Sequence, residues 1–162
     1  MNHLKIKKMQ SNNDKLNQEL ISFLRQDELD YPAGAAKFGP ASLPLLQELI
    51  KTDDENLATK AAYLAGFIKD KSVPSILAEA ASNKFATVRI AAGFGAKKLA
   101  PASASAVLQK IMNDNDSGVL KMGISAVHDL KMADQFKARL KKISAAHQDD
   151  IIRKSAGKLI NK

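Results

Sequence analysis

The sequence predicts an all-α protein made of helical hairpins that repeat about every 31 residues. Two columns of apolar residues carry this repeat, and no stretch alternates apolar and polar residues for long enough to form a strand. The first column has spacings of 31, 31 and 32 residues, at Leu46, Leu77, Leu108 and Leu140. The second column has spacings of 31, 31 and 33 residues, at Leu57, Val88, Val119 and Ile152.

Each residue of the second column begins the apolar stripe of one helix. Apolar or small residues follow it at offsets of 4, 7, 8 and 11, which trace one face of a helix with 3.6 residues per turn. After Val88, for example, these residues are Ala92, Gly95, Ala96 and Leu99. We therefore expect the second helix of each hairpin to bury this stripe in the core.

The first helix of each hairpin is predicted to follow a side chain that can accept a hydrogen bond from a free backbone N–H. Pro44 and Pro74 then fall in the first turn, where a missing N–H costs little. The expected capping residues are Ser42, Ser72, Ser103 and Asp134. The expected first helices are Leu43–Lys51, Val73–Ala81, Ala104–Asn113 and Gln135–Ser144.

Polar turns separate the two helices of each hairpin. In three hairpins an acid lies just ahead of the second helix, where the helix dipole favours negative charge: Asp54, Asp116 and Asp149.

A degenerate copy of the hairpin precedes these four. The segment 38–42 parallels the segment 99–103, so Tyr31–Phe38 is predicted to be a second helix capped by Asp30. Lys15–Arg25 would then be its first helix, which gives about five hairpins and ten helices. Terminal repeats are expected to be atypical because one of their faces has no neighbour.

The length of 162 residues fits one domain. We expect a poorly ordered basic N-terminus over residues 1–13 and a single repeat domain over residues 14–162. Its repeats span about 15–40, 42–71, 72–102, 103–133 and 134–162. No apolar run has the length of a signal peptide core or a membrane span, so we expect no membrane span and a cytoplasmic location.

The composition excludes several kinds of site. The chain has no cysteine, which rules out thiol catalysis, disulfides and cysteine-ligated metal centres. It has no tryptophan and only 5% aromatic residues, which disfavours nucleic-acid recognition by base stacking. The net charge of +8 favours anionic partners. Residues 1–72 hold 10 bases and 10 acids, whereas residues 73–162 hold 15 bases and 7 acids, so the positive charge lies in the C-terminal part.

The chain resembles the HEAT-repeat family, in particular its short-repeat bacterial and archaeal branch that is named after phycobilin lyases. The resemblance rests on the segments 86–92 and 150–156, each with an aliphatic–arginine pair followed by alanine, and on the Gly-Pro-Ala-Ser linker at 39–42. The hairpins that begin their second helices near Leu57 and Val119 lack the arginine. The resemblance implies a right-handed α-solenoid of about five HEAT-like hairpins, whose second helices line an inner surface that binds another macromolecule.

No set of residues has the spacing that catalysis or metal binding requires. The three histidines, His3, His128 and His147, do not pair at a metal-ligand spacing. The turn at 114–118 has some of the acids of a calcium loop, but Ser125 stands where the loop needs a glutamate. We therefore expect no enzyme activity, no cofactor, no metal and no small-molecule substrate.

The outward face of the second helices offers a binding surface. Offsets of 2, 6, 9 and 10 from the start of each stripe point away from the core. Along this face an apolar and aromatic patch grades into a basic one, which suits a protein partner with an acidic surface. The partner-binding residues that we predict are Tyr63, Phe67, Ile90, Phe94, Lys97, Lys98, Lys121, Lys154 and Lys158.

Other interpretations of this face remain open. Phe67 and Phe94 would instead fold sideways into contacts between repeats, and the lysines would form an ordinary solvated surface. We expect a non-catalytic adaptor or scaffold, with two alternatives. The first is nucleic-acid or other polyanion binding through the basic C-terminal half. The second is a bilin-lyase-like or DNA-repair enzyme; the lack of tryptophan argues against a helical-repeat glycosylase.

Overall fold

The protein is all-helical over the residues that the structure describes. The structure is a computed structural model that describes the backbone of residues 3–161 and the side chains of residues 13–161. Within this range there are ten α-helices and no strand, which confirms the prediction that the protein is all-α. The helices are α1 (His3–Leu24), α2 (Tyr31–Phe38), α3 (Leu43–Ile50), α4 (Glu55–Phe67), α5 (Val73–Ala80), α6 (Ala86–Ala96), α7 (Pro101–Met112), α8 (Ser117–Asp129), α9 (Lys137–Ala146) and α10 (Asp150–Ile160), with a 3-10 turn at Pro40–Ser42.

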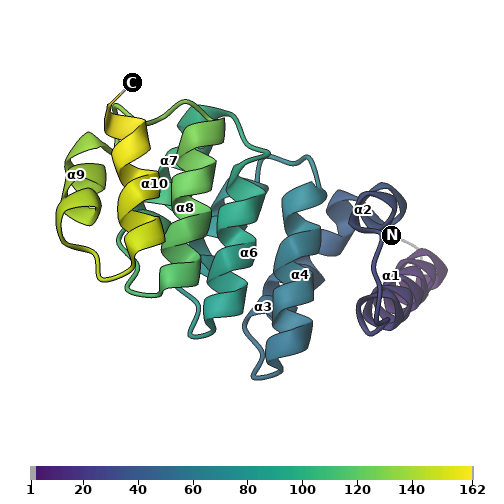
Figure 1. Ribbon diagram of the computed structural model, residues 1–162. Helices are drawn as coiled ribbons and strands as arrows, with labels where there is room; N and C mark the ends of the chain where they lie inside the picture. The colour runs from purple at the N-terminus through teal and green to yellow at the C-terminus, as the bar shows by residue number, and fades with distance from the viewer. Residues whose placement is uncertain (1–2, 162) are drawn as a thin grey trace.

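The helices from α3 onward form antiparallel pairs that lie in two layers. In one layer α4, α6, α8 and α10 lie side by side in a row (Figure 1). In the other layer α3 packs on α5 and α5 packs on α7, and each helix of this layer also packs on the helix that follows it in the chain. Helices α1 and α2 lie at the end of the row opposite to α9 and α10 (Figure 1).

The core fills the space between the two layers. All four leucines of the first column are completely buried: Leu46, Leu77, Leu108 and Leu140. The four residues of the second column are also buried: Leu57, Val88, Val119 and Ile152. The two columns of the sequence are therefore the two walls of one continuous apolar core.

Most predicted helix bounds agree with the structure to within three residues. Tyr31–Phe38 agrees at both ends, whereas α7 begins three residues before the expected start, at Pro101. The largest difference is at α1, which was predicted to begin at Lys15 and begins at His3. The poorly ordered N-terminus that we predicted for residues 1–13 lies partly outside the described residues, and from His3 onward its backbone is helical.

The predicted capping of the first helices is wrong. Ser42 and Ser72 precede α3 and α5, but their backbones are already helical, with φ near −83° and ψ near −16° in both. A capping side chain needs an extended backbone to reach the free N–H groups. The Ser42 hydroxyl instead donates to the Gly39 carbonyl at 2.6 Å, and the Ser72 hydroxyl donates to Asp70. Ser103 lies inside α7, and Asp134 lies two residues before Phe136, the residue that precedes α9.

The aspartates ahead of the second helices do act as caps. Asp30, Asp54, Asp116 and Asp149 all have an extended backbone, and each carboxylate accepts a hydrogen bond from a backbone N–H in the first turn. Each such cap contributes about 1 kcal/mol to helix stability. The acids in these turns thus fix where α2, α4, α8 and α10 begin, whereas α6 follows Phe85 and has no side-chain cap.

Candidate functional site

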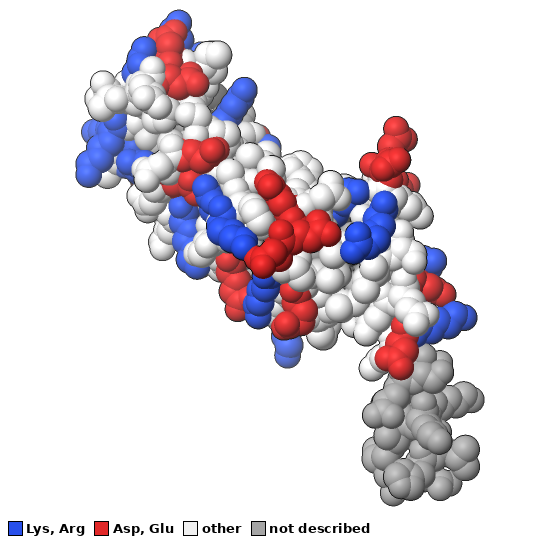
Figure 2. Space-filling view, turned by 90° about the horizontal axis from the view of Figure 1, so that it is seen from below, with Lys and Arg blue, Asp and Glu red and all other residues white. Residues whose placement is uncertain are grey.

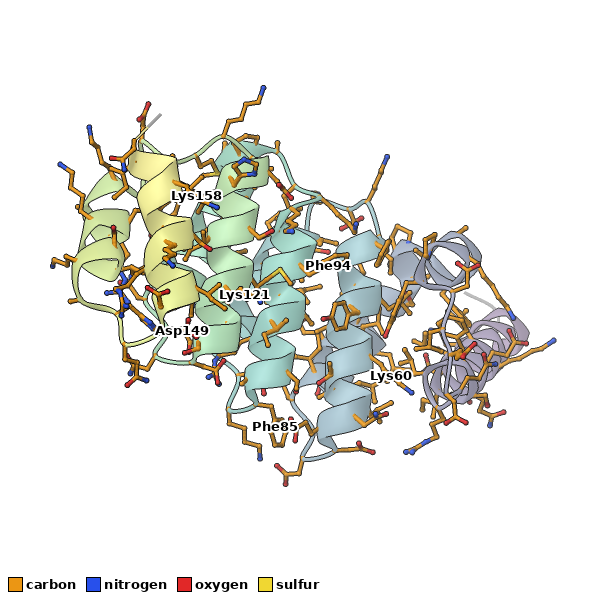
Figure 3. All side chains as sticks on the ribbon, in the orientation of Figure 1. Lys60, Phe85, Phe94, Lys121, Asp149 and Lys158 are labelled. Atoms are coloured by element: carbon orange, nitrogen blue, oxygen red, sulfur yellow. The ribbon has the colours of Figure 1, made fainter. Side chains whose placement is uncertain are left out.

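Four aromatic rings form one contiguous group on the face of the helix row, which we call the aromatic cluster: Tyr31 of α2, Tyr63 and Phe67 of α4, and Phe94 of α6. Neighbouring ring centroids lie 5.6 to 6.0 Å apart, within the range of favourable aromatic contacts. Tyr31 is stacked on Phe67 with an angle of 5° between the ring planes. Figure 3 shows Phe94 between α6 and α4. All four residues are half-buried, so the cluster is part of the surface.

Lys98 covers part of the aromatic cluster with its ammonium group. Its Nζ lies 4.3 Å from the ring centroid of Phe67 and 4.6 Å from that of Phe94. Both distances are within the range of cation–π attraction, which contributes about 0.5–1 kcal/mol at an exposed site. The cluster therefore carries a positive group above two of its rings.

The two tyrosines of the cluster stay protonated to a higher pH than free tyrosine. Burial raises the pKa of Tyr31, and the neighbouring Tyr63 raises it further. Burial also raises the pKa of Tyr63. A surface pocket of about 450 Å³ lies beside both rings. The pocket is further lined by Glu55, Thr59 and Lys60. Its wall therefore combines the hydroxyl groups of the tyrosines and Thr59 with one acidic and one basic side chain.

Lys97 lies in a contact between helices. Its Nζ donates to the Ser125 hydroxyl at 2.6 Å and lies 3.3 Å from a carboxylate oxygen of Asp129. Hydrogen bonds from His128 and from Lys97 lower the pKa of the Asp129 carboxyl. Only 22% of the Lys97 side chain is exposed. Lys97 thus joins α6 to α8, although the sequence predicted a contact with a partner.

Three predicted lysines lie on the exposed surface of α8 and α10: Lys121, Lys154 and Lys158. Figure 3 shows Lys121 and Lys158 along these two helices. Lys154 pairs with Asp150 at 2.8 Å, and this hydrogen bond is the largest cause of the lowered pKa of the Asp150 carboxyl. From below, blue side chains project at the end of the molecule that α9 and α10 form, with red side chains among them, and the middle of the view also carries both signs (Figure 2).

Ile90 lies apart from the aromatic cluster. It is half-buried, and its Cδ1 would lie 3.3 Å from a Cβ built on Gly118, so it reaches toward the start of α8. Of the nine predicted residues, Tyr63, Phe67, Phe94 and Lys98 come together in one group.

Tyr31 is the one residue of the cluster that was not predicted from the sequence. The prediction used offsets from the apolar stripe of each second helix, and Tyr31 is the first residue of the short helix α2, ahead of any stripe. The available signal was compositional: the chain contains two tyrosines, and the other, Tyr63, was on the predicted face.

Within residues 13–161 no three histidine, aspartate or glutamate side chains come close enough together to hold a metal ion. In the part of the chain that the structure describes, no helix is both long enough and apolar enough to cross a membrane. Comparison of the chain with models of known protein families gave no match, and neither did comparison with curated protein sequences.

Proposed function

We propose that this protein is a non-catalytic adaptor or scaffold that binds another protein through the face formed by α4, α6, α8 and α10. The arrangement we propose is a right-handed solenoid of HEAT-like hairpins, with the row of second helices as its inner surface. The observation that supports this function best is the aromatic cluster, which joins three helices and leaves part of each of four large rings in contact with water.

The energetics of the cluster favour a partner. A half-buried ring keeps part of its apolar surface in water, and covering that surface stabilises a complex by about 25 cal/mol per Å². Aromatic residues near the centre of an interface commonly provide most of its binding energy. Because the rings already contact one another, they lose little side-chain freedom when a partner covers them.

The lysines around the cluster favour an acidic partner. Lys98 lies above the cluster, and Lys121 continues the same face on α8. Charges at the edge of an interface mainly raise the association rate and select among partners. We therefore propose a partner segment with an apolar anchor flanked by aspartate or glutamate.

Selection of binding peptides tests this proposal. A displayed library of random peptides is selected on the full chain, and the binders are compared on Phe94→Ala and on Phe85→Ala. Phe85 is a matched control, because it is also half-buried and has a lysine, Lys84, 5.0 Å from its ring centroid. Figure 3 shows it at the opposite end of α6 from the aromatic cluster.

We expect acidic peptides with an apolar anchor that bind the protein and Phe85→Ala equally and bind Phe94→Ala about tenfold or more weakly. Peptides that bind all three proteins equally would contradict the proposed surface.

The basic helix α9, which is the first helix of the last hairpin, supports the second candidate function, polyanion binding. Lys137, Lys141 and Lys142 are exposed on this helix, while Arg139 donates to the Met112 carbonyl at 2.6 Å. If the protein binds nucleic acid here, affinity for duplex DNA should fall steeply with salt and should fall further in Lys141→Glu/Lys142→Glu. Binding that is insensitive to both changes would exclude this candidate.

A further inference from the structure

A surface concavity of about 800 Å³ lies on α10 at the end of the helix row. Its lining includes His128 of α8, Ser144 of α9, Asp150, Arg153 and Gly157 of α10, and Asn161, which directly follows α10. It is separate from the aromatic cluster, which lies on α2, α4 and α6. The equivalent face of α6 packs against the next hairpin, α7–α8, so α6 shows what kind of partner this face of α10 could bind.

Arg89 and Arg153 occupy equivalent positions one residue after the apolar column. The Arg89 Nη1 donates to the carbonyls of the residues six and five positions before it, and the Arg153 Nη1 does the same. Arg89 also donates through Nε to Asp114 at 2.7 Å, across to the turn between α7 and α8. Arg153 instead pairs with Asp150 of its own helix at 3.0 Å, and 36% of its side chain is exposed against 19% for Arg89.

At two further pairs of equivalent positions, the residue at α6 contacts α8 and the residue at α10 has no such contact. A Cβ built on Gly93 of α6 would lie 2.8 Å from Cγ of Met122, which belongs to α8. A Cβ built on the equivalent Gly157 would meet only Ser144 of the neighbouring α9 within 4 Å. Lys97 contacts Ser125 and Asp129 of α8, whereas its equivalent Asn161 lines the concavity. The positions that α6 uses to contact the next hairpin are therefore also present on α10, where the described chain leaves them without such a contact.

The opposite end of the chain carries a turn with matching chemistry. Asp114 lies two residues before the capping Asp116, and Glu28 lies two residues before the capping Asp30. Asp27 and Glu28 are exposed in the turn between α1 and α2, at the far end of the row from α10 (Figure 1).

We propose that the concavity on α10 receives the α1–α2 end of a second copy of this chain, with Glu28 of that copy paired to Arg153. On α10 a single carboxylate, Asp150, is shared between Arg153 and Lys154, and Lys158 lies beside it, so this face keeps a net positive charge. The acidic turn with Asp27 and Glu28 and the basic face of α10 carry opposite charges, which fixes the direction of the contact. A head-to-tail contact of this kind does not close on two copies and extends into a row.

Sedimentation velocity of the full chain at low salt, over a wide range of concentration, tests the proposal. We expect species larger than a dimer for the unaltered protein. We expect that Arg153→Ala and Asp27→Ala/Glu28→Ala each weaken self-association about tenfold or more. Gly157→Leu should block the concavity without any change in charge, and it replaces glycine with a better helix former. Lys121→Ala, on the face of α8, is the control and should associate as the unaltered protein does.

A mixture of two variants gives the sharpest result. The Arg153→Ala variant keeps the acidic turn at Asp27 and Glu28, and the Asp27→Ala/Glu28→Ala variant keeps the basic face of α10. The mixture should therefore contain a one-to-one dimer and nothing larger. A protein that sediments as a monomer at every concentration would overturn the proposal. Self-association that persists unchanged in Arg153→Ala and in Gly157→Leu would overturn it as well.

Discussion

The rings of Tyr63 and Phe94 lie 5.6 Å apart between centroids, edge to face at 61°, although they are 31 residues apart in the chain. They occupy the same offset on the adjacent helices α4 and α6, and both were predicted to lie on the outward face. The contact shows that the side chains lean toward each other across the groove between helices. The aromatic cluster is therefore a contact between repeats and an exposed surface at the same time.

Titration of the tyrosines tests the burial of the cluster. Because the chain has two tyrosines and no tryptophan, its tyrosine absorbance reports on the cluster alone. We expect both phenols to ionise above the ordinary pKa of 10.0, with Tyr31→Phe and Tyr63→Phe each leaving one raised titration. Titration of either residue at the ordinary pKa would show that its ring is fully solvated.

The same pKa shifts predict a loss of stability at high pH. A phenol whose pKa is higher in the folded state holds its proton more tightly there than in the unfolded chain. The free energy of unfolding should therefore be unaffected below the unfolded pKa, near 10, and should fall as pH rises through the folded pKa. Denaturant unfolding across this range should show a smaller fall in Tyr31→Phe/Tyr63→Phe. An equal fall in the double variant would assign the loss to other groups.

Arg89 and Arg153 should differ in their contribution to stability. Arg89→Ala leaves Asp114 without its partner when that carboxylate is only 10% exposed, and breaking such a pair costs about 2–5 kcal/mol. Arg153→Ala removes a pair that is largely exposed, so beyond the lost backbone hydrogen bonds it should cost much less than Arg89→Ala. Chemical denaturation at high salt, where self-association is screened, measures both. Equal losses would mean that Arg89 does not stabilise the contact between hairpins.

A charge on the second column should unfold the protein. Val88 is completely buried among apolar side chains, so Val88→Asp must bury an unpaired carboxylate or open the core, at a cost of several kcal/mol. Circular dichroism and thermal melting should show loss of the cooperative helical fold. Lys121→Asp, an exposed position on the next helix of the row, should melt within a few degrees of the unaltered protein. A soluble and cooperatively melting Val88→Asp would mean that the column is not in the core.

The sequence predicted the helices and the buried columns because both depend on periodicity, which is a property of neighbouring residues along one helix. The contacts of single polar side chains were harder to predict. Ser42 was expected to cap α3, but it is the last residue of the 3-10 turn that precedes α3, so its backbone is already helical. Lys97 lies on the outward face as predicted, yet its long side chain bends to Ser125 and Asp129 on the next helix. Tyr31 joins the cluster because of how α2 packs on α4, which no spacing in the sequence encodes.

The affinity of one selected acidic peptide for the protein and for Phe94→Ala, measured together with both melting temperatures, tests the central claim most directly. We predict that Phe94→Ala weakens binding by about 2 kcal/mol or more while its melting temperature falls by only a few degrees. The ring of Phe94 is half-buried, so a partner can cover the part of its apolar surface that remains in contact with water. A large fall in melting temperature with unchanged affinity would contradict the account, since Phe94 would then serve only the packing of α4 against α6.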